Sequence, residues 1–210
     1  MFFTNKFISR KLVFIWLALI STTVVSGELI QRNSDAERIK AAKQVSQQFV
    51  KQLGGHLKKE MKTNGPVTAI KVCKDVAPEI ANNLSLENGW RVTRVTEKPR
   101  NALLGSTDKW ESETLASFES RAAKGEHYKN MAKGEIVDEA GKSYFRFMKP
   151  LEVKPVCLKC HGSDEQIPPA VKTQLDDMYP YDQARGYKIG DLRGAISIKQ
   201  PMDIPLRKTF

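Results

Sequence analysis

Two cysteines and a histidine near the C-terminal end carry the spacing with the clearest chemistry. The segment Cys157-Leu158-Lys159-Cys160-His161 follows the pattern Cys-x-x-Cys-His, which is the attachment signature of c-type haem. Two thiols on one short turn reach both vinyl groups at one porphyrin edge, and the histidine that follows lies beneath the ring as an iron ligand. The motif predicts one covalent haem c, with thioethers at Cys157 and Cys160 and His161 as axial ligand.

The same cysteine pair has two other interpretations. A Cys-x-x-Cys pair also serves as the redox dithiol of thiol–disulfide oxidoreductases, usually beside a βαβ unit, which the sequence does not predict. The motif residues together with Cys73 also supply four donors for a structural zinc module. A histidine directly after the second cysteine fits haem better than zinc, and covalent haem would consume both thiols of a dithiol enzyme.

The third cysteine raises the question of the sixth iron ligand. The chain has three cysteines, and in an oxidising compartment an odd count leaves one thiol unpaired. Cys73 shares an expected helical face with Val67, Ile70 and Ala77, so it is either a small core residue or an iron ligand. The other candidate ligands, which we expect to be exposed histidines and packed methionines, are His56, His127, Met61, Met131, Met148, Met178 and Met202.

The N-terminus has the composition of an export signal. Lys6, Arg10 and Lys11 precede an apolar run over residues 12–20, and small residues follow up to Gly27. This order predicts a signal peptide over residues 1–27, or an uncleaved membrane anchor. Either way we expect the folded part outside the cytoplasm, in the periplasm, with membrane association only if the segment is retained.

The remaining composition fits one haem domain without a catalytic centre. The chain has 210 residues, 40% of them hydrophobic, and a formal net charge of +10. The bases do not gather into a block, so we expect no nucleic-acid partner. The basic surface is either simply solvated or favours an acidic redox partner or an anionic membrane face. No constellation of catalytic bases is evident, so we expect no enzyme.

The patterning predicts an α+β fold with an antiparallel sheet and a long N-terminal helix. That helix is expected from Ala36 to Met61, and a break at residues 63–66 precedes a second helix that starts near Val67 and carries Cys73. Further along the chain we expect a strand at 90–96, a helix at 108–123, a hairpin of 134–137 with 142–148, and a last strand at 192–198.

From Ala36 to Ile198 the chain resembles the exported single-haem c-type cytochromes with a PAS-like fold, a family formerly labelled a domain of unknown function that also occurs as the sensor part of signalling proteins. The matching stretches, besides the haem motif, are residues 69–78 (Ala-Ile-Lys-Val-Cys-Lys-Asp-Val-Ala-Pro), Gly89-Trp90 with Arg94, 98–101 (Lys-Pro-Arg-Asn), Trp110-Glu111 and 186–195 (Gly-Tyr-Lys-Ile-Gly-Asp-Leu-Arg-Gly-Ala).

The resemblance implies a PAS-like haem domain with iron held by histidine and cysteine thiolate, which by position are His161 and Cys73. Arg94 and Arg100 become candidate partners of the haem propionates, because a guanidinium pairs well with a carboxylate; ordinary surface or sheet packing is the alternative. The sequence departs from the family pattern at Ala102-Leu103-Leu104, so the resemblance does not extend to contacts between this loop and the haem propionates.

These observations divide the chain into a signal over 1–27, an N-terminal helical segment over 28–65 and a haem domain over 66–210. We expect redox or gas sensing, or electron transfer, with an unidentified redox partner or signalling protein.

Overall fold

The computed structural model describes the backbone of residues 21–206 and the side chains of residues 35–206. The basic and apolar parts of the expected export signal therefore lie outside the described residues. The chain falls into two compact units, Met1–Arg38 and Ile39–Phe210, and the second unit contains the sheet and the cysteines. This unit begins within the segment that the sequence assigned to a separate N-terminal helix. No helix in the described part of the chain is long and apolar enough to cross a membrane.

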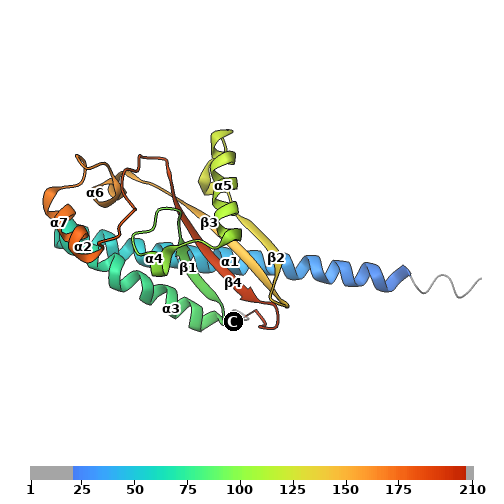
Figure 1. The fold of residues 1–210 in the computed structure, drawn as a ribbon. Coiled ribbons are helices and arrows are strands. Elements are labelled where there is room, and N and C mark those ends of the chain that lie inside the picture. Colours follow the sequence, from blue (N-terminus) through green and yellow to red (C-terminus); the bar gives the residue numbers. More distant parts are fainter. Residues whose placement is uncertain (1–20, 207–210) are drawn as a thin grey trace, which may run out of the picture. The chain divides into compact units, whose positions relative to one another are not determined.

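A four-stranded antiparallel sheet, in the order β1-β4-β3-β2, forms the centre of this unit (Figure 1). The strands are β1 (Arg91–Val95), β2 (Lys133–Glu139), β3 (Lys142–Glu152) and β4 (Leu192–Pro201). The expected hairpin is present as β2 and β3. Ala140 and Gly141 connect them with φ values of 50° and 77°, which suits the turn preferred between two strands of right-handed twist.

Helices cover both faces of the sheet. On one face, the part of α1 (Ser21–Thr63) from Ile39 onward and α3 (Ala77–Asn88) pack against the strands in a core that includes Phe49, Leu84, Phe147 and Ile198. On the other face lies α5 (Lys109–Ala123), whose start is fixed by a capping box between Asp108 and Glu111. The predicted α+β class, with its antiparallel sheet and long N-terminal helix, is confirmed.

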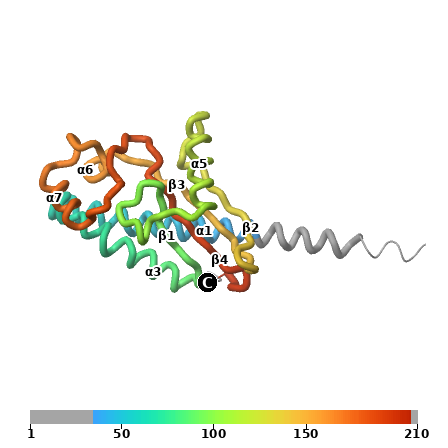
Figure 2. Tube along the Cα trace, viewed as in Figure 1, coloured from blue at the N-terminus to red at the C-terminus, as the bar shows by residue number. Residues whose placement is uncertain are grey.

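Short helices gather beyond one end of the sheet (Figure 2). They are α2 (Gly65–Lys71), the π-helical turn η1 (Val72–Val76), the turn η3 (Pro155–Cys157), α6 (Leu158–His161) and α7 (Pro169–Met178). The remaining short elements are α4 (Ala102–Gly105) and η2 (Tyr128–Asn130). Sequence patterning did not predict α7, which joins α2 through a separate apolar cluster that contains Ile70, Val171 and Leu175. This cluster anchors the C-terminal part of the chain beside the helix that leads to Cys73.

A bulge interrupts β4 at its first residues. Leu151 pairs with Gly194 whereas the next residue of β3, Glu152, pairs with Leu192, so Arg193 is an extra residue without a partner in the ladder. Bulges of this kind turn a side chain out of the regular alternation. Gly194 makes the bulge feasible, because its φ is +136° and a Cβ atom there would lie 2.2 Å from the carbonyl oxygen of Val95.

The Gly194→Ala substitution should therefore destabilise the fold by about 2–5 kcal/mol, through backbone strain and overlap with β1. Urea unfolding of the full chain measures this change. Gly54→Ala is the matched control, because Gly54 lies inside α1 with open space around it. This variant should be more stable than the wild type by up to about 1 kcal/mol. Equal stability of the two variants would contradict the assigned geometry at Gly194.

Candidate functional site

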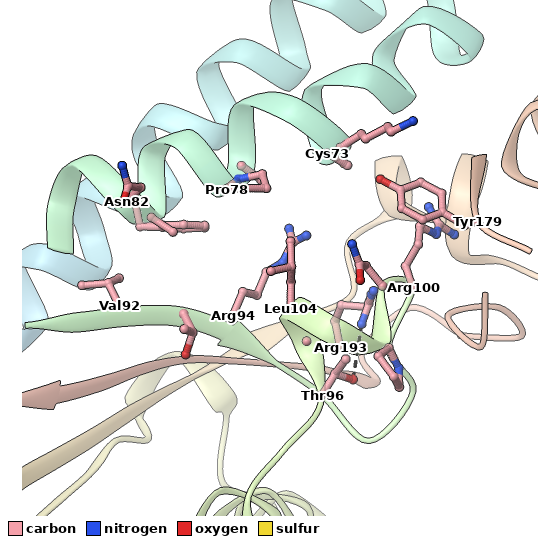
Figure 3. A pocket seen from close by; sticks show the side chains of 18 of the residues that line it. Cys73, Pro78, Asn82, Val92, Arg94, Thr96, Arg100, Leu104, Tyr179 and Arg193 are labelled. Carbon is pink, nitrogen blue, oxygen red and sulfur yellow. Dashed lines mark hydrogen bonds between the residues drawn. The ribbon is translucent and has the colours of Figure 1, made fainter. Parts of the chain in front are cut away.

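A cavity of about 290 Å³ opens between the helices η1 and α3 and the strands β1 and β4 (Figure 3). Its walls combine apolar side chains with three arginines and both predicted iron ligands. The residues of its wall that bear on chemistry are Cys73, Pro78, Arg94, Arg100, His161, Tyr179 and Arg193. The volume lies near the lower end of the range for small-molecule sites, roughly 300–1,000 Å³.

Cys73 reaches the cavity from a π-helical turn rather than from a regular α-helix. Pro78 has no N–H group and cannot bond to the carbonyl of Lys74, which weakens the α-helical pattern at this point. The N–H of Ala77 instead bonds to the carbonyl of Val72, five residues earlier. Cys73 and Ala77 both line the cavity, as the expected shared face predicts, whereas Val67 and Ile70 belong to the α2–α7 cluster. π turns recur at functional sites.

His161 ends the short helix α6, and its ring is oriented from two sides. Its Nδ1 lies 2.7 Å from the carbonyl oxygen of Ala184, which requires a proton on Nδ1 and leaves Nε2 with a free electron pair. The ring of Tyr187 stands edge-on to it, with centroids 6.2 Å apart and planes at 89°. Burial, followed by the charges of Arg193 and Arg100, holds the pKa of His161 well below its usual value. The imidazole is therefore neutral at neutral pH, the form that binds metals.

The two motif cysteines lie beside the cavity. Both are free thiols and partly buried. Cys157 packs against the cluster of Val153, Ala184 and Tyr187, and Cys160 packs against the α2–α7 cluster. Burial raises the pKa of Cys160, and the nearby Cys73 adds to this effect. In dithiol enzymes, by contrast, the pKa of the reactive thiol is lowered.

Arg100 forms a buried ion pair and hydrogen bonds with other residues of the chain. Its Nε donates to Asp182 at 3.2 Å, and both side chains are almost fully buried. Its Nη2 donates to the carbonyl of Cys160 and, at 3.4 Å, to that of Ala184. Its 3.3 Å approach to Nδ1 of His161 is a packing contact, because that nitrogen already carries a proton. Arg100 thus ties the haem-motif turn to the loop that contains Ala184.

The other two arginines of the cavity have no carboxylate partner within residues 35–206. Arg94 extends from β1, and Arg193 leaves the bulge of β4 (Figure 3). Arg193 donates to Thr96 Oγ1 at 3.3 Å, and its guanidinium lies 5.2 Å from the ring centroid of Tyr187. Burial lowers the pKa of Arg193 to about 10, so it remains charged at neutral pH. Burial also raises the pKa of the cavity residue Tyr179 to about 12.

Sequence reasoning did not select Arg193 because regular alternation does not predict a bulge. The signal in the sequence was the glycine that follows it within a strand pattern. Of the seven alternative iron ligands, none lines the cavity. His56 and His127 are exposed, and Met131 and Met148 are buried in the core beneath α5.

The zinc arrangement considered from the sequence is not assembled. Within the described part of the chain, no three or more His, Cys, Asp or Glu side chains are grouped so that they could hold a metal ion. The structure places Cys73 and His161 on one cavity, with Cys157 and Cys160 beside it, but not as one tetrahedral set.

Comparison with known proteins places the chain in a family. The family model described as Tll0287-like matches residues 25–201. The chain belongs to the Tll0287-like family. A solved structure, that of the cyanobacterial haem protein Tll0287, has the same fold with a TM-score of 0.58 and 23% sequence identity, over 81% of this chain and 96% of that one. No protein of curated function matches the chain.

In this member of the Tll0287-like family, Asp182→Asn should leave Arg100 charged and buried without a carboxylate. Removing one partner of such a pair costs about 3–5 kcal/mol, so the urea midpoint of the full chain should fall markedly. Glu113→Gln is the control, because its pair with Lys109 is exposed and is worth less than about 1 kcal/mol. A loss no larger than that of the control would contradict the role of the Arg100–Asp182 pair.

Proposed function

We propose that the chain carries one covalent haem c and acts as an exported monohaem cytochrome in electron transfer or in redox or gas sensing. The observation that carries the proposal is that Cys73 and His161, from distant parts of the sequence, line one cavity in which the hydrogen bond to Ala184 leaves Nε2 of His161 free. The description of the family relative as a haem protein supports the same cofactor.

The residues present fit this group in three ways. His161 is neutral and has a backbone partner that fixes its orientation, as second-shell partners do for metal-binding histidines. Cys157 and Cys160 are free thiols on the turn that leads to His161. Cys73 is partly buried at the cavity and has a sulfur that can serve as the opposite axial ligand. In this proposal the axial ligands are His161 and Cys73.

The chemistry of the porphyrin distinguishes the two predicted propionate partners. The vinyl and propionate groups lie on opposite sides of the macrocycle, so thioethers at Cys157 and Cys160 direct the propionates away from the motif. Arg100 bonds to the carbonyl of Cys160 and is paired with Asp182, so in this proposal it lies on the thioether side. Arg94 has no carboxylate partner among residues 35–206, so we propose Arg94 as the propionate partner.

When bound, the haem supplies a one-electron iron couple. A thiolate from Cys73 favours the ferric state and a low reduction potential, and two protein ligands leave no position for substrate. We therefore propose no enzymatic activity. Release of Cys73 on reduction would open a position for a gas such as carbon monoxide, which is the sensing form of the proposal. The partner is a redox protein or a signalling protein.

The alternative of a thiol–disulfide oxidoreductase is less well supported, because burial raises the pKa of Cys160 and a reactive dithiol needs an accessible thiolate. Export to the periplasm, the segment boundaries at residues 27 and 65 and the PAS-like description all belong to the proposal. They rest on the sequence pattern and the family resemblance.

Expression with the signal in a host that matures c-type cytochromes tests the proposal. The protein should carry haem that survives denaturing electrophoresis and gives a pyridine haemochrome typical of two thioethers. Cys157→Ser and Cys160→Ser should each reduce covalent attachment, because each removes one thioether. Cys73→Ala is the matched cysteine control: it should keep the covalent haem but change the ferric absorption spectrum through loss of the axial sulfur.

Other outcomes of these experiments would contradict parts of the proposal. An unchanged ferric spectrum in Cys73→Ala would contradict ligation by Cys73 while leaving the cytochrome in place. A colourless wild-type protein would contradict the cytochrome itself. Bound zinc or catalysed thiol–disulfide exchange in that protein would then support one of the alternatives.

A further inference from the structure

The guanidinium of Arg193 is a positive charge in the cavity that no acid of the described chain neutralises. Arg193 donates one hydrogen bond to Thr96 and stacks on Tyr187, and it forms no ion pair within residues 35–206. Burying a charge without a counter-charge is costly. The bulge at Arg193, made feasible by the positive φ of Gly194, directs this charge toward the cavity. A group held at such cost is a candidate for function.

Arg193 is linked to the proposed iron ligand through one aromatic ring. Tyr187 has the guanidinium of Arg193 over its face at 5.2 Å from the centroid and meets the ring of His161 edge-on at 6.2 Å. The N–H of Tyr187 also donates to the carbonyl of His161 at 2.9 Å. Arg193 is therefore electrostatically close to the site of the iron.

We infer that Arg193 raises the reduction potential of the iron. It does so by holding an uncompensated positive charge beside the iron site formed by His161 and Cys73. This inference rests on the proposed function. Ferric iron carries one more positive charge than ferrous iron, so a nearby cation destabilises the ferric state, and the effect is strong where water is excluded. Arg193 thus opposes the thiolate of Cys73, which stabilises the ferric state.

The three arginines of the cavity differ in this respect. The charge of Arg100 is balanced by Asp182, and that of Arg94 is balanced by a propionate in the proposed complex. The guanidinium of Arg193 lies against Tyr187 beside His161, on the motif side, and the propionates are directed away from that side. Arg193 bonds only to a hydroxyl and an aromatic ring among the described residues, and neither group is a carboxylate. Its charge therefore acts on the iron with the least cancellation, and its removal should change the potential most.

The midpoint potential of the mature full chain, measured by spectroelectrochemical titration, tests the inference. Arg193→Gln should shift the potential to a more negative value, by about a tenfold change in the ferric-to-ferrous ratio at fixed potential, or about 59 mV for one electron. Arg193→Lys, which keeps the charge but loses the planar fork, should stay close to the wild type. The ferric spectrum should be unchanged in both variants, because neither axial ligand is altered.

An unchanged or more positive potential in Arg193→Gln would overturn the inference, as would equal shifts in the Gln and Lys variants, which would indicate a purely structural role. Arg193→Met, whose side chain still covers Tyr187, gives the same readout if the Gln variant does not mature. These results differ from failure of the proposed function, in which the wild-type protein itself has no covalent haem to titrate.

Discussion

The buried ion pair between Arg100 and Asp182 holds together the segments on which the site depends. Arg100 follows β1, Asp182 follows α7, and the guanidinium also bonds to the carbonyls of Cys160 and Ala184. Asp182 accepts a hydrogen bond from the N–H of Ala184 at 2.8 Å, which fixes the loop at this residue. The carbonyl of Ala184 then orients His161. One ion pair thus sets the tautomer and direction of the residue proposed to bind iron.

The walls of the cavity depend on two local departures from regular structure. The π-helical turn at Val72–Val76 presents Cys73 from the helical side, and the bulge in β4 presents Arg193 from the sheet. Each departure follows from a single residue: Pro78 removes a donor from the helix, and Gly194 adopts a backbone conformation that other residues rarely reach. At both places the regular backbone hydrogen-bond pattern is interrupted next to a residue whose side chain lines the cavity.

Local patterns in the sequence were sufficient for the scaffold. Alternating residues predicted the strands and the β2–β3 hairpin, and the helix expected at 108–123 matches α5 to within one residue at its start. The motif at Cys157–His161 and the odd cysteine at position 73 selected His161 and Cys73, which line one cavity. These features could be predicted because each depends on residues close together in the sequence.

The features that local patterns missed depend on long-range pairing. The short helix α7 has few periodic positions and is stabilised by its packing on α2. The role of Arg100 depends on Asp182, 82 residues away, and no local pattern connects them. The direction of Arg193 depends on the register of β4 against β3. Tertiary contacts decide each of these, so the sequence suggested arginines near the haem without distinguishing their partners.

The most direct test of the proposed ligation is X-ray absorption at the iron edge of the oxidised, mature protein. Ligation by His161 and Cys73 predicts one sulfur in the first coordination shell and otherwise only nitrogen, with the sulfur lost in Cys73→Ala. A first shell without sulfur in the wild type, or one unchanged by the substitution, would contradict the central claim that His161 and Cys73 hold the iron from the two sides of this cavity.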